Sequence, residues 1–360
     1  MMGRVFAEPL RQVDSTHVLW RGGKLLYFGG CDYLRLSWHP KVIRAVQVGL
    51  EKYGLNVAAS RKTTGNHPIY EKLEEATAKY FGCERAVLVS NGYLTNLAVA
   101  QALIGRVSQA FVDEGAHSSL QDALQFLGAK VERFKHRDAE DLKRKVGRAK
   151  TGSVAVLTDG LFAHNGAIAP LGEYRRILGG NGLLWVDDSH AAGVLGKNGR
   201  GTVEIAGVGR GNLIQTITFS KGFGVYGGAI LTDRNIWKRV VQDSRIVTGN
   251  TPLPLPLANA VLTALGLASD GARKKLHQNI RELFRLGGRK PPDITVPIIM
   301  VEPRSRAAAR TFQRALLKAG IYPSFIRYPG GPEAGYFRFA ISAEHRRKDL
   351  ERLGCLLATA

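Results

Sequence analysis

Cysteine is scarce in this sequence, which contains only Cys31, Cys83 and Cys355 among its 360 residues. Their positions have none of the spacing that metal-binding cysteines show, so no metal site is expected. A long chain with few scattered thiols is typical of a reducing compartment, where disulfides are rare. The sequence therefore predicts a cytoplasmic protein without disulfides or a structural metal.

Long hydrophobic runs are also absent. No apolar stretch reaches the length of a membrane-spanning helix, and residues 1–9 lack the apolar segment of a signal peptide. Hydrophobic residues still make up 44% of the chain, which is enough for a packed core. We expect one large domain, or a large domain with a smaller one, and no contact with a membrane.

Acidic residues are few, because 30 Asp and Glu face 51 Lys and Arg for a net charge of +21. Such a charge makes nucleic-acid binding a hypothesis to consider. The basic residues are spread along the chain, however, and no zinc-finger or RNA-binding motif accompanies them, which argues against that role. A basic surface also suits anionic coenzyme A or an acidic acyl carrier protein.

Short apolar segments alternate with amphipathic ones through the middle of the chain. The predicted strands lie at residues 85–89, 110–112, 130–134, 153–160, 182–190, 212–219 and 229–232. Predicted helices between them indicate an α/β fold with a mostly parallel sheet sandwiched by helices.

The two ends of the chain follow other patterns. Residues 1–40 read as an N-terminal arm with two short strands, and residues 41–250 as the large α/β domain. Residues 251–360 are predicted to contain a linker helix and a small C-terminal α+β domain. The linker helix is expected from about residue 258, and a strand is expected at 321–326.

Several chemically useful residues come directly after the predicted strands. Gly92, His117 and Lys221 each follow a predicted strand, and Asp187 and His190 lie at the C-terminal end of the one predicted at 182–190. Ligands of parallel sheets bind at the carboxyl ends of the strands, so these residues are expected to converge. This convergence is the strongest functional signal that the residues carry before any family is considered.

Lys221 follows a strand and precedes four glycines within seven positions. A lysine held close to backbone loses hydration, which lowers its pKa towards a nucleophilic amine. Pyridoxal phosphate needs such an amine, a carboxylate for its pyridine nitrogen and a stacking group. Asp187 suits the carboxylate and His117 the stacking group, although each is also a common cap of the following turn or helix. A metal site of Asp187, Asp188 and His190 is less well supported, since no further ligands cluster nearby.

Several motifs together resemble those of the α-oxoamine synthases, which are fold-type-I pyridoxal phosphate enzymes. The segment Asp187-Asp188-Ser189-His190-Ala191-Ala192-Gly193 is the most specific of them. The others are Thr218-Phe219-Ser220-Lys221-Gly222, Asn91-Gly92-Tyr93, His117-Ser118-Ser119, Thr64-Gly65-Asn66-His67-Pro68 and Ser342-Ala343-Glu344-His345. The resemblance covers nearly the whole chain and implies the same fold, with pyridoxal 5′-phosphate as the cofactor.

The resemblance also implies a role for each matching residue. Lys221 is similar to the lysine that forms a Schiff base with the cofactor and moves the α-proton. Asp187 matches the partner of the pyridine nitrogen, His190 the donor to the O3′ oxygen, and His117 the ring-stacking residue. The implied phosphate contacts are Gly92, Tyr93, Thr218 and Ser220.

Substrate binding and assembly follow from the same resemblance. Arg327 and Arg338 lie in the region whose arginine binds the amino-acid carboxylate, and Asn66 is a further candidate for substrate binding. Members of the family are homodimers with active sites at the subunit interface. Asn250 or Thr251 is therefore expected to reach the phosphate of the partner's cofactor.

The implied activity is condensation of alanine, glycine or serine with an acyl thioester, usually with loss of carbon dioxide. An aminotransferase on the same scaffold is the alternative, and a basic binding protein without catalysis is a remote one. The chain departs from the usual family pattern at four positions: Cys31, Arg35, Tyr70 and Ala163 stand where the usual or frequent residues of the family are Asn, Gly, His and Ser.

Overall fold

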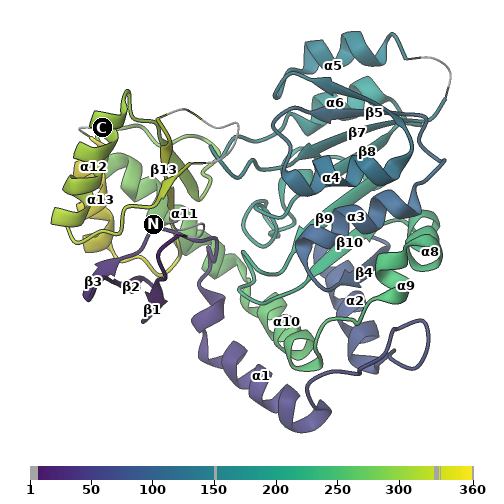
Figure 1. The fold of residues 1–360 in the computed structure, drawn as a ribbon, viewed down its shortest axis with the longest axis horizontal. Coiled ribbons are helices and arrows are strands. Elements are labelled where there is room, and N and C mark those ends of the chain that lie inside the picture. The colour runs from purple at the N-terminus through teal and green to yellow at the C-terminus, as the bar shows by residue number, and fades with distance from the viewer. Residues whose placement is uncertain (1–6, 150–151, 328–331, 333, 359–360) are drawn as a thin grey trace, which may run out of the picture.

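The computed structural model describes residues 7–149, 152–327, 332 and 334–358. Within them the chain forms one seven-stranded sheet and two three-stranded sheets (Figure 1). The large sheet and its helices lie on the right of the view, and the two small sheets lie on the left with the C-terminal helices.

The large sheet has the strand order β4-β10-β9-β8-β7-β5-β6. Its strands are β4 (Arg85–Val89), β5 (Gln109–Asp113), β6 (Lys130–Phe134), β7 (Val154–Asp159), β8 (Leu183–Asp187), β9 (Leu213–Thr218) and β10 (Gly228–Thr232). Strands β9, β8, β7, β5 and β6 pair in parallel, whereas β10 is antiparallel to both of its neighbours. The prediction of a mostly parallel sheet is confirmed.

Both faces of this sheet are buried, because successive side chains of a strand point to opposite sides. In β7, Ala155 and Leu157 pack into one core cluster and Val156 into another. Helices α3 (Gly92–Ala102), α4 (Ser118–Leu127), α8 (Arg234–Asp243) and α9 (Arg245–Gly249) contribute to the first cluster. The opposite face is covered by α2 (Pro68–Phe81), α5 (Ala139–Val146), α6 (Leu171–Leu178) and α7 (Thr202–Ile205).

The strand expected at 182–190 is shorter in the structure. It ends at Asp187, where the backbone N–H of Ser189 donates to the Asp187 carboxylate and starts a turn. Ser189 and His190 therefore lie in the loop beyond the sheet. This turn brings His190 to the carboxyl edge of the sheet, beside the neighbouring strands.

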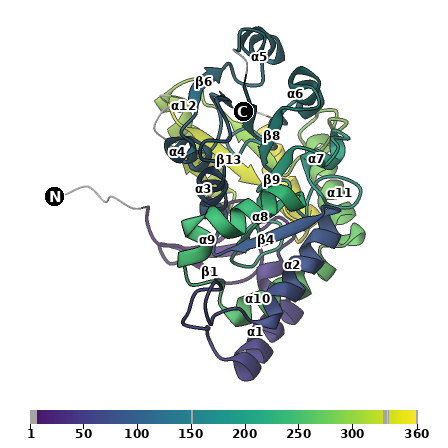
Figure 2. The same ribbon diagram turned by 90° about the vertical axis from the view of Figure 1, so that its right-hand side faces the viewer.

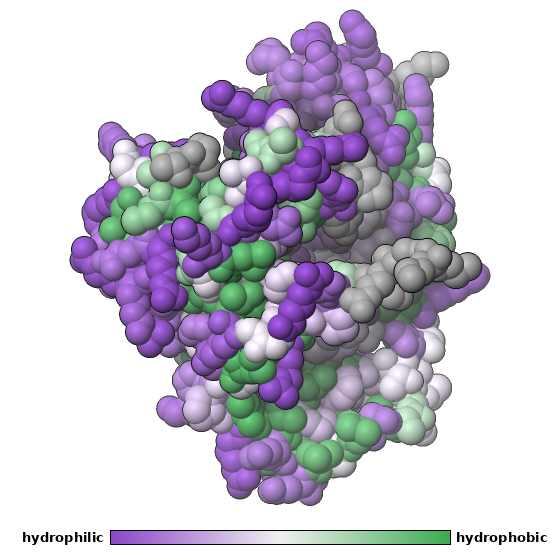
Figure 3. Space-filling view, turned by 60° about the vertical axis from the view of Figure 1, so that its left-hand side comes forward, coloured by the Kyte–Doolittle hydropathy of each residue, from purple (hydrophilic) through white to green (hydrophobic). Residues whose placement is uncertain are grey.

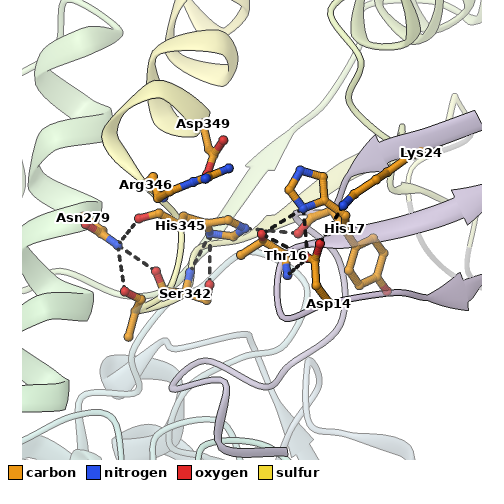
Figure 4. Close-up of polar contacts among 11 residues, drawn as sticks. Asp14, Thr16, His17, Lys24, Asn279, Ser342, His345, Arg346 and Asp349 are labelled. Carbon is orange, nitrogen blue, oxygen red and sulfur yellow. Dashed lines mark hydrogen bonds and ion pairs between the residues drawn. The ribbon is translucent and has the colours of Figure 1, made fainter. Parts of the chain in front are cut away.

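The N-terminal strands pack against the C-terminal part of the chain. One small sheet contains β1 (Arg11–Gln12), β2 (His17–Trp20) and β3 (Gly23–Leu26), and the other contains β11 (Ile298–Val301), β13 (Tyr336–Ala340) and β12 (Phe325–Ile326). His345 joins the two ends of the chain: its Nδ1 accepts from Ser342 N (3.0 Å), and its Nε2 contacts the Tyr27 carbonyl (3.1 Å; Figure 4). Asn279 donates to the carbonyls of Ser342 and His345 in the same network.

Two expectations for the C-terminal part were wrong in detail. The linker helix is two helices, α10 (Leu255–Leu267) and α11 (Asp270–Leu286), because Ser269 leaves the helix and caps α11 through Ala272 N. The strand at 321–326 is reduced to Phe325–Ile326, since Pro323 has no N–H to donate to a neighbouring strand. Helices α12 (Arg306–Lys318) and α13 (Arg347–Leu357) complete this part.

Helix α1 (Pro40–Tyr53) follows the short helix η1 (Leu36–Trp38) and packs along α10, with α2 nearby (Figure 2). Its Val42, Ala45 and Gly49 are buried, yet Ile43 and Leu50 on another side are 44% and 50% exposed. Hydrophobic residues gather on this lower end of the molecule (Figure 3). Among the described helices, none is long and apolar enough to span a bilayer.

Candidate active site

A cavity of about 170 Å³ opens at the carboxyl edge of the large sheet. The structure brings together around it eight of the residues that the sequence singled out, which are Gly92, Tyr93, His117, Asp187, His190, Thr218, Ser220 and Lys221. The parallel strands explain this convergence, because β5, β8 and β9 end at the same edge.

Lys221 supplies the amine of this cavity. Its pKa lies below the ordinary value, chiefly because the protein removes water from the ammonium group. Arg338 lowers the pKa further by charge repulsion, while Cys31, Asp187 and Asp159 oppose the shift. The result is a larger fraction of neutral, nucleophilic amine than an exposed lysine would have.

Asp187 is held by a buried network around Asn96. The Asn96 amide donates to Asp187 Oδ2 (2.6 Å) and to Ser119 Oγ (2.8 Å). Its oxygen accepts from Trp185 Nε1 (3.1 Å) and Thr216 Oγ1 (2.8 Å), so the Asn96 side chain has one orientation. The carboxylate of Asp187 is consequently fixed at the floor of the cavity.

Asp159 lies beside Asp187, because the two residues are paired in register at the ends of β7 and β8. Burial, and then the charge of Asp187, raises the pKa of Asp159 well above its ordinary value. The protonated form of Asp159 is therefore favoured. Its Oδ1 also accepts from the backbone N–H of His117 (3.0 Å), which positions that residue.

His190 is buried and touches Tyr33, whose hydroxyl lies 2.7 Å from His190 Nδ1. Burial, together with the positive charges of Lys221 and Arg338, lowers the pKa of His190 well below its ordinary value, so the ring is neutral. Arg338 Nη2 donates to the Tyr33 oxygen (3.5 Å), which leaves the hydroxyl proton for His190 Nδ1. The His190 proton then resides on Nε2, available as a donor to a ligand.

His117 caps α4, since its Nδ1 accepts from Ser119 N (3.2 Å). Burial lowers the pKa of His117, so this ring is also favoured to be neutral. Tyr93 meets the His117 ring edge-on at 6.1 Å between centroids, and its hydroxyl donates to Asp122. Capping and exposure to the cavity are compatible, because the cap uses only one nitrogen of the ring.

The N-terminus of α3 forms one end of the cavity. Asn91 caps it by accepting from Leu94 N (3.0 Å), and Gly92 and Tyr93 are the first residues of the helix. A Cβ on Gly92 would lie 2.6 Å from Thr218 Cβ, so only glycine allows this close approach. The free N–H groups and the positive end of the helix dipole favour a phosphate here.

Arg338 lies next to the cavity, on β13. Its Nη2 lies 3.4 Å from Cys31 Sγ as well as 3.5 Å from Tyr33 Oη. Its Nε is buried and has no hydrogen-bond partner among the described residues. A planar guanidinium with an unused donor is suited to a carboxylate.

Three other predicted residues do not reach the cavity within one chain. Arg327 is exposed and lies over the Phe325 ring, with 5.4 Å from its Cζ to the ring centroid. Asn66 accepts from Arg61 and donates to Glu71, in a separate hollow. Thr251 is exposed, while the neighbouring Asn250 donates to Ser90 Oγ (3.1 Å), just before α3.

Tyr33, Asn96 and Asp159 were missed by sequence reasoning. Asn96 lies one helical turn after Gly92, and Asp159 ends a predicted strand, so both carried a weak signal. Tyr33 carried none, because its contacts with His190 and Arg338 join parts of the chain that are 157 and 305 residues apart.

The groups around the cavity fit pyridoxal phosphate. Lys221 offers the amine, Asp187 a fixed carboxylate, His190 an N–H donor and the start of α3 an anion site. Asp188, by contrast, turns away to accept from Thr202 and Gln215, so it does not complete a metal site with Asp187 and His190.

Comparison with known proteins agrees with this geometry. The family model for aminotransferase class I and II matches residues 24–354. An 8-amino-7-oxononanoate synthase from Thioalkalivibrio sulfidiphilus is 34% identical over 92% of this chain and 87% of that protein. Another from Cronobacter sakazakii is 33% identical over 96% of this chain and 95% of that protein.

Solved structures show the same likeness. Serine palmitoyltransferase from S. paucimobilis, solved with a bound adduct of pyridoxal phosphate and myriocin, has a TM-score of 0.87 and 26% identity, covering 97% of this chain and 90% of that chain. An 8-amino-7-oxononanoate synthase from Francisella tularensis has a TM-score of 0.79 and 26% identity, covering 93% and 97%. The chain therefore belongs to the aminotransferase class I and II family, among its pyridoxal phosphate-dependent α-oxoamine synthases.

Proposed function

We propose that this protein condenses alanine with a pimeloyl thioester and releases the thiol and carbon dioxide, which is the reaction of an 8-amino-7-oxononanoate synthase in biotin biosynthesis. The observation that carries the proposal is the meeting of Lys221, Asp187 and His190 in one cavity, with Arg338 beside it. The relatives at 33–34% identity that bear this name support the choice of substrates.

Pyridoxal phosphate, when bound, stabilises negative charge at the α-carbon of the amino acid. Asp187 would hold the pyridine nitrogen, His190 would donate Nε2–H to the O3′ oxygen, and His117 would lie against the ring. The start of α3, with Thr218 and Ser220, would bind the phosphate. Each role matches a donor or acceptor that the chain already positions.

The chain's own chemistry concerns one carboxylate and one proton. Arg338 would bind the carboxylate of the amino acid through its guanidinium and so orient the α-carbon. Lys221, with its lowered pKa, would take the α-proton as a neutral amine and return a proton later. Burial at the cavity would strengthen both interactions.

We also propose a homodimer. Ile43 and Leu50 are seven residues apart and lie on the same face of α1. Both remain exposed, although the other side of the helix is buried. Apolar side chains on both sides of a helix favour a second packing partner. Asn66 and Thr251, which do not reach the cavity of their own chain, are proposed to act at the partner's site.

An acidic acyl carrier protein is the proposed donor of the acyl group. Arg306, Arg310, Arg314 and Lys318 repeat every four residues along α12, and all are exposed. Like charges at this spacing destabilise a helix by about 0.2–0.5 kcal/mol per pair, so a binding role would offset a structural cost. An acidic protein surface complements this row of positive charge.

The three free cysteines, none in a disulfide, support a cytoplasmic location.

The proposal is tested by incubating the holoenzyme with alanine and pimeloyl-CoA, or the pimeloyl carrier protein, and measuring free thiol and carbon dioxide. We expect both products in equal amounts, and neither from the Lys221→Ala variant. Serine or glycine serving better than alanine would change the assignment within the family. Amino transfer to a 2-oxo acid without thiol release would indicate an aminotransferase, and absence of both reactions would favour a binding protein.

A further inference from the structure

Cys31 lies beside Arg338, the residue proposed to bind the amino-acid carboxylate. Its Sγ is 3.4 Å from Arg338 Nη2, and the same nitrogen is 3.5 Å from Tyr33 Oη. The thiol therefore occupies one of the donors with which Arg338 would bind an amino-acid carboxylate. An asparagine in place of Cys31 could also contact the guanidinium, but it cannot become an anion.

The surroundings of the thiol favour its ionised form. Arg338, Lys221 and Arg35 are the cations that face it, and Tyr33 and Tyr27 are the phenols. Burial raises the pKa of Cys31, but the charges of Arg338 and Lys221 and the hydrogen bond from Arg338 lower it by more, so that the net shift is downward.

Arg338 has no carboxylate partner among the residues that the structure describes, and its Nε is buried without an acceptor. A largely buried guanidinium needs an anion to offset its lost hydration. The Cys31 thiolate is the group in position to provide that charge before substrate arrives. An incoming carboxylate must then replace it, because two anions at one guanidinium repel each other.

We propose that Cys31 is a specificity-determining residue, whose thiolate competes with the carboxylate of the amino-acid substrate for Arg338. This inference rests on the proposed function. When the carboxylate binds, the thiolate loses its partner and takes up a proton from solvent. Amino-acid affinity consequently falls with rising pH by up to about tenfold per pH unit above the pKa of the thiol.

The first test compares the wild-type holoenzyme with Cys31→Ser and Cys31→Asn, neither of which can ionise. The dissociation constant of alanine is measured from cofactor absorbance between about pH 6.5 and about pH 9.5, a range that spans the ordinary thiol pKa. We expect the wild-type constant to rise more steeply than that of either variant, with kcat changed less than KM. Cys355→Ser is the matched control, since Cys355 is exposed and distant in sequence, and it should retain the wild-type profile.

Parallel pH profiles for wild type and Cys31→Ser would overturn the inference while leaving the proposed function intact. If alanine does not change the wild-type spectrum at any pH, the proposed function fails and the inference fails with it.

The second test does not depend on catalysis. Iodoacetamide labelling of Cys31 and Cys355 is followed by peptide mass spectrometry as a function of pH. We expect the Cys31 labelling midpoint to rise from wild type to Arg338→Gln, whereas the labelling of Cys355 should be the same in both proteins. We also expect alanine to slow labelling at Cys31 alone. An unchanged midpoint in Arg338→Gln would show that the guanidinium does not hold the thiolate, and would refute the competition.

Discussion

Replacing Asn96 by alanine is the perturbation whose effect the structure defines most fully. The side chain is fully buried and makes four hydrogen bonds, to Asp187, Ser119, Trp185 and Thr216. Two of these partners keep another contact, because Ser119 also meets His117 Nδ1 and Thr216 also meets the Val186 carbonyl. In the variant, Trp185 Nε1 and Asp187 Oδ2 have no hydrogen-bond partner among the described residues.

The expected loss in the free energy of unfolding follows from these two unpaired polar atoms. A buried donor without a partner costs about 1–3 kcal/mol, and a lost hydrogen bond to a charged group costs about 1.5–3 kcal/mol. We therefore expect Asn96→Ala to lower the free energy of unfolding by about 3–5 kcal/mol, which is large for a single substitution. Affinity for pyridoxal phosphate should fall as well, since Asp187 loses the group that orients it.

Urea unfolding of the apoprotein, followed by tryptophan fluorescence, measures the first effect, and titration with pyridoxal phosphate measures the second. Asn259→Ala is the matched control, because its amide makes one hydrogen bond, to the Ala45 carbonyl at 2.7 Å. It should cost about 1 kcal/mol and leave cofactor affinity unchanged. If Asn96→Ala were no more destabilising than Asn259→Ala, the Asn96 network would not hold Asp187 as argued.

Three further predictions concern the helix start, the buried histidine and the dimer. Gly92→Ala should weaken pyridoxal phosphate binding at least about tenfold, since the new Cβ would collide with Thr218. Gly266→Ala is the control, because its Cβ would enter open space, and equal dissociation constants for the two variants would count against this reasoning. The pKa of His345 is lowered to about 3 by burial, so the folded state binds fewer protons than the unfolded state below about pH 6.5. The free energy of unfolding should fall by about 1.4 kcal/mol per pH unit below that pH, a loss of about 2 kcal/mol at pH 5. Urea denaturation of His345→Gln should lack this pH-dependent loss. If the proposed dimer forms through α1, Leu50→Lys should convert it to monomer in sedimentation experiments, whereas a dimer that persists would place the interface elsewhere.

Much of the fold and of the site followed from local sequence patterns. Alternating strands and helices predicted the sheet, and residues just past strand ends predicted where a ligand binds. These predictions succeed because the parallel strands β5, β7, β8 and β9 end at one edge, so a position in the chain translates directly into a position in space. The family, the fold and the cofactor are confirmed by the comparisons. The domain boundaries at residues 40 and 250 stay predictions.

Sequence alone determined which side chains have the right chemistry and at which edge of the sheet they lie, since strand ends and helix starts depend on near neighbours. Only the tertiary structure decided which residues act on them. Tyr33 and Cys31 meet Arg338 across about 300 residues, and Asn96 reaches Asp187 across 91. Such contacts depend on how the N-terminal strands and β13 pack beside the large sheet, and no pattern within a short stretch of sequence records that packing.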